Sequence, residues 1–419
     1  MLTQAPRGTK DVLPEESRKW VYLENMFRDV CEVFGYKEIR TPVFEHTELF
    51  KRSIGETTDI VNKEMYTFED NGGRSITLKP EGTAPVVRSF VENKLYADTQ
   101  PTKLFYITPC FRYEKPQAGR LREFHQFGVE AFGTSSPTID AEVIALASEF
   151  FGRLGLQKLV TRINSVGCPS CRKHYNEVLR SYLDSKKEGL CHTCIERSEK
   201  NPMRVIDCKN EGCQSIIKDI PLMIDYICDE CKEHFDKLKL SLENMEIPYE
   251  VDPRIVRGLD YYTKTAFEII SEDIGAQSTV CGGGRYDKLA EEIGGPNTPG
   301  IGFGMGIERL LLTIENNGIA LPLTEGIDIF IVAIGEKAEL ESLKILSQLR
   351  KKGISADKDH MQRSVKAQFK YSNKQNARYT IVLGDDELEN DSVTLKDMSN
   401  SEQTQIKLSS LIDELRSRL

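Results

Sequence analysis

Residues 103–133 contain two stretches in which the side chains alternate in character, joined by a turn region with Pro116, Gly119 and Arg120. Alternation with a period of two is typical of β-strands whose two faces meet different surroundings. This stretch therefore predicts a β-hairpin with a long, basic loop. We expect the rest of the chain to be organised around it.

The two faces of the predicted hairpin differ in chemistry. The even-numbered positions put mainly polar residues on one face: Cys110, Arg112, Glu114, Gln126, Gly128 and Glu130. The odd-numbered positions are largely apolar and suit a core: Phe111, Tyr113, His125, Phe127 and Val129. An arginine fixed beside carboxylates can bind a phosphate while the acids accept hydrogen bonds from an ammonium group. A half-exposed hairpin whose charges pair in water explains the same pattern, and this stretch alone does not separate the two.

The length and charge of the chain limit its class. A chain of 419 residues is long enough for about three domains with a substantial core. Its hydrophobic content of 39% and net charge of −9 predict a soluble protein that contacts RNA, if at all, through local patches. The first residues hold no apolar run after their basic residues, and no apolar stretch reaches about 18 residues. These features predict a cytoplasmic protein that does not interact with a membrane.

Several elements are predicted before the hairpin. Apolar residues at three- and four-residue steps predict an amphipathic helix over residues 14–36, and residues 37–44 form a predicted strand whose Pro42 suits a sheet edge or a subunit boundary. A second predicted strand leads through Glu81 and Thr83 into a helix over residues 84–96. Those two residues suit either capping of the helix or contact with a ligand.

Eight of the eleven cysteines fall between residues 168 and 231, in a stretch rich in lysine and glutamate that we interpret as an inserted domain. Their pairs are Cys168 and Cys171, Cys191 and Cys194, Cys208 and Cys213, and Cys228 and Cys231. The first four match zinc-site spacing, and a zinc ion would stabilise an insert with a small core. Spare candidate ligands are His174, His192 and His234. Reduced thiols in a helical insert are the alternative, and the spacing does not decide which four cysteines would share an ion.

Glycine alternates with apolar residues from Gly300 to Gly306, so one face of this predicted strand is bare backbone. A flat heterocycle could lie there, or another backbone could pack closely against it. Glu308 and Arg309 follow at the start of a helix. Neither common phosphate-binding glycine motif is present, so a bound nucleotide is expected to be held by arginines.

Strands and helices alternate beyond residue 326, which predicts a small α/β domain. Within it, nine lysines and arginines lie between residues 350 and 378, close to Phe369 and Tyr371. Cations suit phosphates and aromatic rings suit unstacked bases, so this stretch is a candidate RNA-binding face. A solvated basic helix is the alternative.

The sequence resembles the histidyl-tRNA synthetases, a family of class II aminoacyl-tRNA synthetases, over essentially its entire length. The resemblance rests on PRGTKDVLPEE at residue 6, LKPEGTAPVVR at 78, FRYEKPQAGRLREFHQFGVE at 111, RGLDYYTKTAFE at 257 and GGGRYDKLAEEIGGPNTPGIGFGMGIERLLL at 282. The chain departs from the family at Lys79, where arginine is common, and at Gln362, where glycine is usual. Its insert also has more cysteines than that of most relatives.

The resemblance implies an α+β protein with an antiparallel catalytic sheet flanked by helices, a mainly helical cysteine-rich insertion and a C-terminal α/β anticodon-binding domain. The implied boundaries are 1–166 and 249–322 for the catalytic core, 167–248 for the insertion and 326–419 for the anticodon-binding domain. It also implies a homodimer formed partly around Pro42. In the implied reaction, ATP and histidine form histidyl-adenylate, with Mg²⁺ on the outer phosphates, and tRNA(His) then accepts the histidyl group.

The resemblance also implies roles for single residues. Arg112 would hold the α-phosphate, Glu114 the adenine side and Arg309 the γ-phosphate, and Gly304 would line the ATP site. Arg257 would neutralise charge on the α-phosphorus in the transition state. The remaining set would bind histidine, with the two tyrosines bracketing its imidazole: Glu81, Thr83, Gln126, Glu130, Tyr261 and Tyr262. The loop over residues 115–122 would approach the acceptor end of the tRNA, and the insertion would grip its acceptor arm.

A non-catalytic relative that senses histidine, such as the regulatory subunit of ATP phosphoribosyltransferase, is the alternative. Such chains typically lose the arginines and the anticodon-binding domain. This chain keeps Arg112, Arg257, Arg309 and the C-terminal α/β region, so the sequence favours the enzyme.

Overall fold

The computed structural model describes residues 3–55, 58, 60–256, 261–271, 279–323 and 325–419. The chain divides into two compact units, Met1–Leu321 and Pro322–Leu419. Arg257, to which the sequence assigns a catalytic role, lies outside the described residues.

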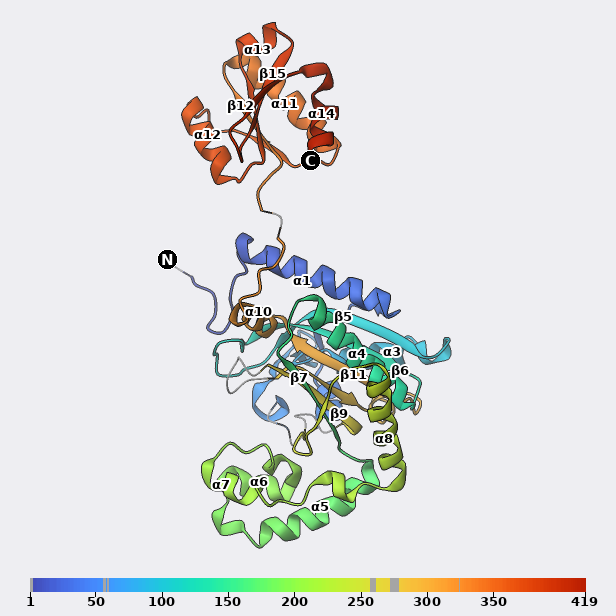
Figure 1. The fold of residues 1–419 in the computed structure, drawn as a ribbon. Helices are drawn as coiled ribbons and strands as arrows, with labels where there is room; N and C mark the ends of the chain where they lie inside the picture. The colour runs from blue at the N-terminus through green and yellow to red at the C-terminus, as the bar shows by residue number, and fades with distance from the viewer. Residues whose placement is uncertain (1–2, 56–57, 59, 257–260, 272–278, 324) are drawn as a thin grey trace. The chain divides into compact units, whose positions relative to one another are not determined.

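An eight-stranded sheet forms the centre of the first unit, in the order β1-β5-β6-β11-β10-β9-β7-β8 (Figure 1). The five inner pairings, from β5–β6 to β9–β7, are antiparallel, and only the two-residue edge strands pair in parallel. The predicted antiparallel sheet is therefore confirmed. The strands are β1 Lys37–Glu38, β5 Thr102–Phe111, β6 Glu123–Phe132, β7 Leu159–Ser165, β8 Glu250–Val251, β9 Thr263–Ser271, β10 Thr279–Arg285 and β11 Gly300–Gly306.

The predicted hairpin is β5 and β6, paired in register from Thr102 opposite Phe132 to Phe111 opposite Glu123. Phe127 and Val129 are fully buried on one side of β6, as predicted. The prediction extends the first strand too far, because Arg112, Tyr113 and Glu114 follow the end of β5. Tyr113 is 54% exposed instead of buried, and its ring lies under the Arg122 guanidinium at 3.8 Å.

Helices cover the apolar side of this sheet. The aromatic rings of Phe27 in α1 and Phe127 in β6 stack there, with centroids 4.6 Å apart. Apolar side chains of four helices contribute to this core: α1 Pro14–Val33, α4 Pro137–Arg153, α8 Asp229–Asn244 and α10 Ile307–Asn316. On the opposite side, α3 Thr83–Glu92 and α9 Leu289–Glu292 pack against a second cluster that contains Tyr106, Tyr262 and Tyr286. The polar residues of the hairpin face this second side.

The strand predicted over residues 37–44 is two short strands in different sheets. β1 joins the large sheet, whereas β2 Phe44–His46 pairs with β4 Ser75–Leu78, which also pairs with β3 Tyr66–Glu69. Pro42 lies between them and has no N–H to donate to a strand ladder. Helix α2 Thr47–Ile54 follows β2.

The cysteine-rich stretch between β7 and β8 is mainly helical, as predicted. Its helices are α5 Pro169–Asp184, α6 His192–Lys200, α7 Glu211–Ile217 and α8. The first three enclose a small core of their own around Tyr175 and Leu179. Helix α8 instead places Phe235, Leu238 and Leu242 in the main core, so the insertion returns to the sheet along this helix (Figure 1).

A buried polar cluster joins four elements of the first unit. Asp140 of α4 and Arg285 of β10 are fully buried and form an ion pair. The Thr265 hydroxyl of β9 donates to Asp140 at 2.6 Å, and His234 Nε2 of α8 lies 2.8 Å from the same carboxylate. Burial alone would raise the pKa of Asp140, but the Arg285 guanidinium and His234 hold it below its usual range.

The second unit is a five-stranded sheet in the order β13-β12-β14-β15-β16. The parallel strands β13, β12 and β14 and the antiparallel β15 and β16 agree with the predicted α/β domain. Its elements are β12 Ile329–Ala333, α11 Glu336–Lys351, β13 Ala356–Lys358, α12 Val365–Lys374, β14 Tyr379–Leu383, α13 Asp385–Glu389, β15 Ser392–Asp397, β16 Gln403–Lys407 and α14 Leu411–Arg418.

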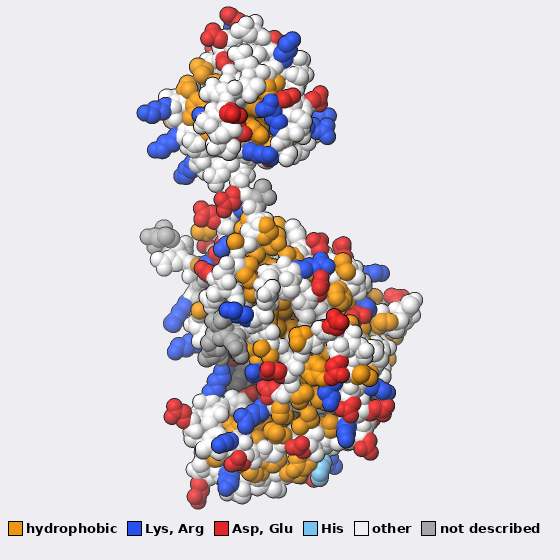
Figure 2. Space-filling view, viewed as in Figure 1, with side chains coloured by type: hydrophobic (Ala, Val, Ile, Leu, Met, Phe, Trp, Pro, Cys, Tyr) orange, Lys and Arg blue, Asp and Glu red, His pale blue; other side chains and the backbone are white. Residues whose placement is uncertain are grey.

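Aromatic and basic residues of this unit do meet. The Arg363 guanidinium lies 4.4 Å from the ring centroid of Tyr371, and Lys396 Nζ lies 5.4 Å from that of Phe369. Acidic and basic side chains are interspersed over the face shown in Figure 2. Among the described residues, no helix has both the length and the apolar character needed to cross a membrane.

Asp140→Ala should destabilise the first unit by about 3–5 kcal/mol, because it leaves the buried Arg285 without its main counter-charge. Urea unfolding followed by the fluorescence of Trp20 reports on this unit, since Trp20 lies in its core and is the only tryptophan of the chain. Glu149→Ala in the same helix is the control: it removes the exposed pair with Arg153 and should cost less than about 1 kcal/mol. Equal effects of the two substitutions would contradict this account of the cluster.

Candidate active site

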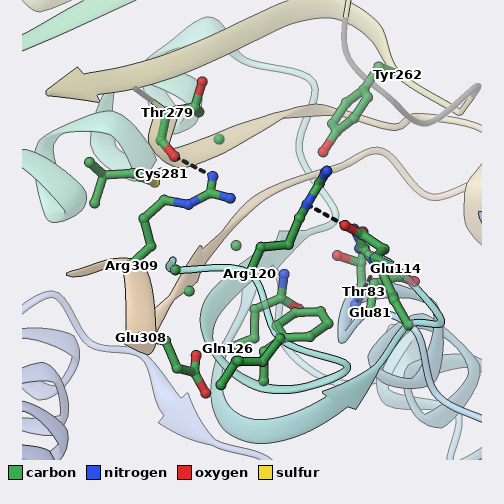
Figure 3. Close-up of a pocket in the computed structure, with 18 of the residues that line it drawn as sticks. Glu81, Thr83, Glu114, Arg120, Gln126, Tyr262, Thr279, Cys281, Glu308 and Arg309 are labelled. Atoms are coloured by element: carbon green, nitrogen blue, oxygen red, sulfur yellow. Dashed lines mark hydrogen bonds and ion pairs between the residues drawn. The ribbon is translucent and has the colours of Figure 1, made fainter. Parts of the chain in front are cut away.

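A pocket of about 280 Å³ opens on the polar side of the large sheet (Figure 3). It is lined by residues from the start of α3, the β5–β6 hairpin, the start of β9, β10, β11 and α10. Nine of the residues predicted from the sequence line it: Glu81, Thr83, Arg112, Glu114, Gln126, Tyr261, Tyr262, Gly304 and Arg309. Segments more than 200 residues apart in the sequence thus meet at one site.

Glu81 lies at the start of α3 and caps it. Its carboxylate accepts hydrogen bonds from the backbone N–H of Thr83 at 2.8 Å and of Ala84 at 2.7 Å. Burial raises the pKa of Glu81 above its usual value, although these two N–H groups oppose the shift. The sequence left capping and ligand contact as alternatives, and the geometry shows that this residue caps the helix and also lines the pocket.

Three arginines line the pocket together with the carboxylates of Glu81, Glu114 and Glu308. Arg112 Nε donates to the carbonyl oxygen of Pro80 at 2.7 Å, and Arg309 Nη1 donates to that of Thr279 at 2.7 Å. Arg120 from the hairpin loop pairs with the buried Glu114 (Figure 3). Burial, with the neighbouring Arg120 and Arg112 guanidiniums, lowers the pKa of Arg309. Oriented guanidiniums in a partly desolvated cleft suit a polyphosphate.

Glu130 lies behind the lining of the pocket and is fully buried. Its carboxylate accepts hydrogen bonds from the hydroxyls of Tyr106, at 3.2 Å, and Tyr286. Burial raises the pKa of Glu130 to about 8, although the two hydroxyls oppose this shift. A nearby cation would stabilise the ionised form of a carboxyl group buried in this way.

The glycine face of β11 is only partly open. A methyl group at Gly300 or Gly302 would overlap the ring of Tyr286 or the carboxylate of Glu130, so these glycines admit neighbouring side chains. Gly304 and Gly306 do line the pocket, and a methyl group at Gly304 would lie 2.6 Å from Gln126 Nε2. The strand therefore offers bare backbone to a ligand at one end only.

Tyr261 and Tyr262 lie next to each other at the pocket wall, with ring centroids 4.8 Å apart. This spacing leaves no room for an imidazole ring between them, so the expected bracketing geometry is not present.

Other residues of the pocket were missed by the sequence analysis. Arg120, Glu308, Thr279 and Cys281 line the pocket, and Tyr106 supports Glu130 from β5. Tyr106 could have been found, because it shares the even-numbered face with Gln126 and Glu130. Glu308 accepts hydrogen bonds from the backbone N–H of His125 at 2.9 and 3.1 Å, a contact that no local pattern indicates.

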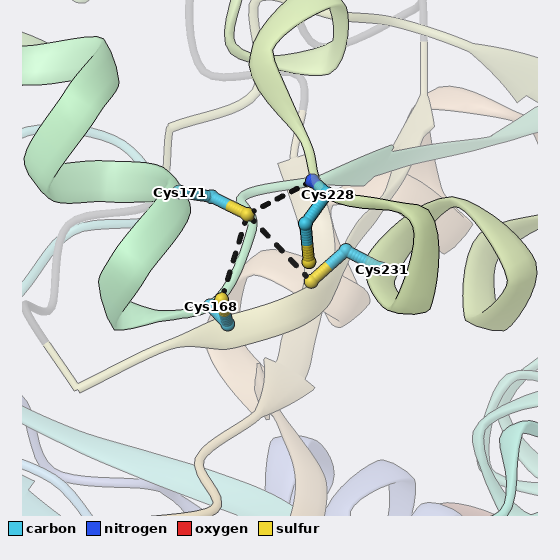
Figure 4. A group of neighbouring side chains, drawn as sticks. All are labelled: Cys168, Cys171, Cys228 and Cys231. Carbon is cyan, nitrogen blue, oxygen red and sulfur yellow. Dashed lines mark hydrogen bonds between the residues drawn. The ribbon is translucent and has the colours of Figure 1, made fainter.

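The eight clustered cysteines form two separate groups. Cys168 and Cys171 lie with Cys228 and Cys231 (Figure 4), and the two middle pairs form the other group: Cys191, Cys194, Cys208 and Cys213. The first four cysteines, whose spacing matches a zinc site, therefore do not share one site. His174, His192 and His234 belong to neither group among the described residues.

Comparisons with known proteins agree on one family. The family description "Histidyl-tRNA synthetase" matches residues 8–310, and "Anticodon binding domain" matches residues 328–418. The chain is 66% identical to a histidine–tRNA ligase of Clostridioides difficile, over all of both chains, and 63% identical to that of Alkaliphilus oremlandii, over 97% of each. The solved structure of apo histidyl-tRNA synthetase from S. aureus is 43% identical, covers 99% of this chain and 100% of its own, and superposes with a TM-score of 0.86.

The stability of the protein should depend on Glu130 between pH 5.5 and 7.5. The folded chain keeps the proton up to about pH 8, whereas the unfolded chain releases it near pH 4.5, so stability falls as the pH rises through this window. Between pH 5.5 and 7.5, we expect the free energy of unfolding of the wild-type protein to fall by about 2 kcal/mol more than that of the Glu130→Gln variant. Urea unfolding of both proteins without substrates measures the difference, and parallel pH profiles would contradict the assignment.

Proposed function

The chain belongs to the histidyl-tRNA synthetase family, and on that premise we propose that it attaches L-histidine to tRNA(His) by way of histidyl-adenylate. The observation that carries this proposal is the meeting of three arginines with buried carboxylates in one pocket. Activation of an amino acid needs both, because ATP carries negative charge and the amino acid presents an ammonium group.

The arginine side of the pocket is the proposed ATP site. The family resemblance implies that Arg112 would bind the α-phosphate and Arg309 the γ-phosphate. Backbone carbonyl oxygens hold both guanidiniums in place. Glu114 would lie toward the adenine, and the bare backbone at Gly304 would allow the nucleotide to approach β11. Arg120 pairs with Glu114 in the structure and would have to rearrange if ATP occupies this space.

The carboxylate side is the proposed histidine site. The ammonium group and backbone of histidine would be received by Glu81, Thr83, Gln126 and Glu130. A cation near Glu130 would favour its ionised form, which burial otherwise disfavours. Tyr261 and Tyr262 would contact the imidazole from one side. Pairing of both imidazole nitrogens with polar groups would reject analogues that lack them.

The proposed chemistry is electrostatic and needs no covalent link to the protein. The histidine carboxylate attacks the α-phosphorus of ATP, pyrophosphate leaves, and the tRNA then takes the histidyl group from the adenylate. Arg112 and Arg257 would stabilise the negative charge that develops on the α-phosphate oxygens. Mg²⁺, when bound, would neutralise the outer phosphates, and the carboxylate of Glu308, near Arg309, is an oxygen donor of the type it prefers.

The remaining parts of the chain have proposed roles in binding partners. The second unit, which matches the anticodon-binding family, would bind the anticodon, and the loop over residues 115–122 and the insertion would contact the acceptor arm. The insertion would hold zinc through its cysteines. The domain boundaries, the homodimer and the cytoplasmic location stay predictions.

The histidine-sensing alternative is less well supported. Histidine–tRNA ligases match the chain over its full length at up to 66% identity, and the anticodon-binding region is present. Histidine-dependent exchange of pyrophosphate into ATP separates the two functions. The enzyme should exchange with histidine and not with the other amino acids, whereas a sensor would bind histidine in calorimetry without exchange.

Arg257→His should slow histidyl-adenylate formation by at least about 100-fold and change histidine affinity only a few-fold, because the lost guanidinium acts mainly in the transition state. Pre-steady-state pyrophosphate release and calorimetry measure the two quantities. Arg254→His, at an exposed arginine three residues earlier, is the control and should leave both unchanged. Near wild-type release by the Arg257 variant would overturn its role.

A further inference from the structure

The two cysteine groups differ in their place in the insertion. We call Cys168, Cys171, Cys228 and Cys231 the root group, because they lie at the starts of α5 and α8, next to the end of β7 (Figure 4). We call Cys191, Cys194, Cys208 and Cys213 the outer group, which joins the start of α6 to the turn before α7 and to the first turn of α7 itself. In each group, all four sulfurs lie within 4.8 Å of one another.

The sulfur separations fit a single tetrahedral ion. Four thiolates at about 2.3 Å from zinc are about 3.8 Å from one another. In the root group, Sγ of Cys171 lies 3.5 Å from that of Cys168 and 4.0 Å from that of Cys231. In the outer group, Cys191 and Cys208 are separated by 3.9 Å. The two sulfur atoms of a disulfide are about 2.05 Å apart, so these pairs are too widely spaced to be disulfides. Clusters with several irons bind their thiolates through different metal atoms, whereas four sulfurs at these distances fit one shared ion.

The backbone around both groups suits thiolates. Cys168, Cys191 and Cys228 occupy the N-cap positions of α5, α6 and α8, where helix dipoles favour negative charge. Backbone N–H groups also point at sulfur: that of Cys228 lies 3.1 Å from Cys171 Sγ, and that of Cys191 lies 3.2 Å from Cys213 Sγ. Both features offset the charge of four thiolates, which one divalent ion only half neutralises.

We propose that the insertion holds two Zn²⁺ ions, one in each group, and that only the root ion positions the histidine side of the pocket. The sequence spacing favoured a zinc site formed by the first four of these cysteines. In this assignment, the four cysteines of the outer group lie between the two pairs of the root group along the chain. The second part of the proposal rests on the proposed activation of histidine.

Contacts just beyond the root cysteines connect this group to the pocket. One residue after Cys171, the Arg172 guanidinium donates to the carbonyl oxygen of Tyr262, which lines the pocket. Three residues after Cys231, His234 joins the buried cluster of Asp140 and Thr265. An ion that fixes the starts of α5 and α8 relative to each other would therefore fix the chain around Tyr262 at the start of β9.

A second contact ties the root group to the same strand. Lys264 Nζ donates to Glu230 at 2.8 Å, next to Cys231, and the backbone N–H of Lys264 donates to the carbonyl oxygen of Gly167 at 2.9 Å, next to Cys168. Cysteines of both groups lie in the insertion's own small core with Leu190, Val205 and Ile217, but these contacts to β9 and Tyr262 come from residues next to the root cysteines. Loss of the outer ion should therefore leave the histidine side of the pocket in place.

The metal content of the full-length protein, purified without chelators, tests the first part. We expect two zinc ions per chain by elemental analysis, and zinc X-ray absorption should show four sulfurs at about 2.3 Å. Zero or one zinc per chain, iron in place of zinc, or a shell with nitrogen or oxygen would overturn the assignment. This measurement uses the wild-type protein and does not depend on catalysis. The zinc content therefore tests the metal assignment whether or not the chain activates histidine.

Paired variants test the second part. Cys168→Ser with Cys228→Ser, and Cys191→Ser with Cys208→Ser, should each lose one zinc ion. In pyrophosphate exchange, the root variant should raise KM for histidine at least about 10-fold and KM for ATP less than 2-fold, whereas the outer variant should change both less than 2-fold. Equal effects of the two variants on KM for histidine, or none from the root variant, would overturn the positioning role.

A variant that replaces one thiolate by another zinc ligand separates the effect of losing the metal from that of a folding defect. Cys171→His keeps a ligand that zinc accepts and should retain two zinc ions and restore KM for histidine to within a few-fold of wild type. A Cys171→His protein that keeps its zinc but has the raised KM of the root double variant would overturn the positioning role. Absence of exchange by the wild-type protein with two zinc ions bound would instead refute the proposed function and leave the metal assignment intact.

Discussion

The ion pair between Arg285 and Asp140 is the interaction on which the site most depends. Both side chains are fully buried, so each charge is tolerated only because the other is present. The residue after Arg285 is Tyr286, whose hydroxyl donates to Glu130. Asp140 also holds Thr265 of β9 and His234 of α8. One charge pair thus helps to fix Tyr286, which supports Glu130, and also strand β9 and helix α8.

The pocket built on this frame brings arginines and carboxylates together. Arg112 and Arg309 are oriented by backbone carbonyl oxygens, and Glu130, behind the pocket lining, is held by tyrosine hydroxyls. Groups that are oriented before substrate binds lose little free energy to reorganisation, and burial strengthens their interaction with developing charge. Burial raises the pKa of Glu130, and a cationic group of a substrate nearby would oppose that shift.

Local patterns in the sequence predicted the hairpin, the two faces of β6 and the C-terminal α/β unit, because side-chain alternation and helix periodicity are local properties. The antiparallel sheet as a whole was implied by the family resemblance. Local patterns did not predict where β5 ends: the backbone N–H of Tyr113 donates to the carbonyl oxygen of Glu64, a long-range contact. They also did not predict the nested grouping of cysteines, because Cys168 and Cys228 are far apart in the sequence and come together only in the folded insertion. The burial of Glu130 beneath Gly302 likewise depends on the register between β6 and β11.

The central claim is that this pocket joins histidine to AMP. Its most direct test is to incubate the purified protein with histidine and Mg²⁺-ATP in the absence of tRNA and to identify the bound product by mass spectrometry. We expect histidyl-adenylate to be retained on the wild-type protein and not on Arg112→Ala, which lacks the proposed α-phosphate ligand. Binding of histidine and ATP without any adenylate, or equal adenylate on both proteins, would contradict it.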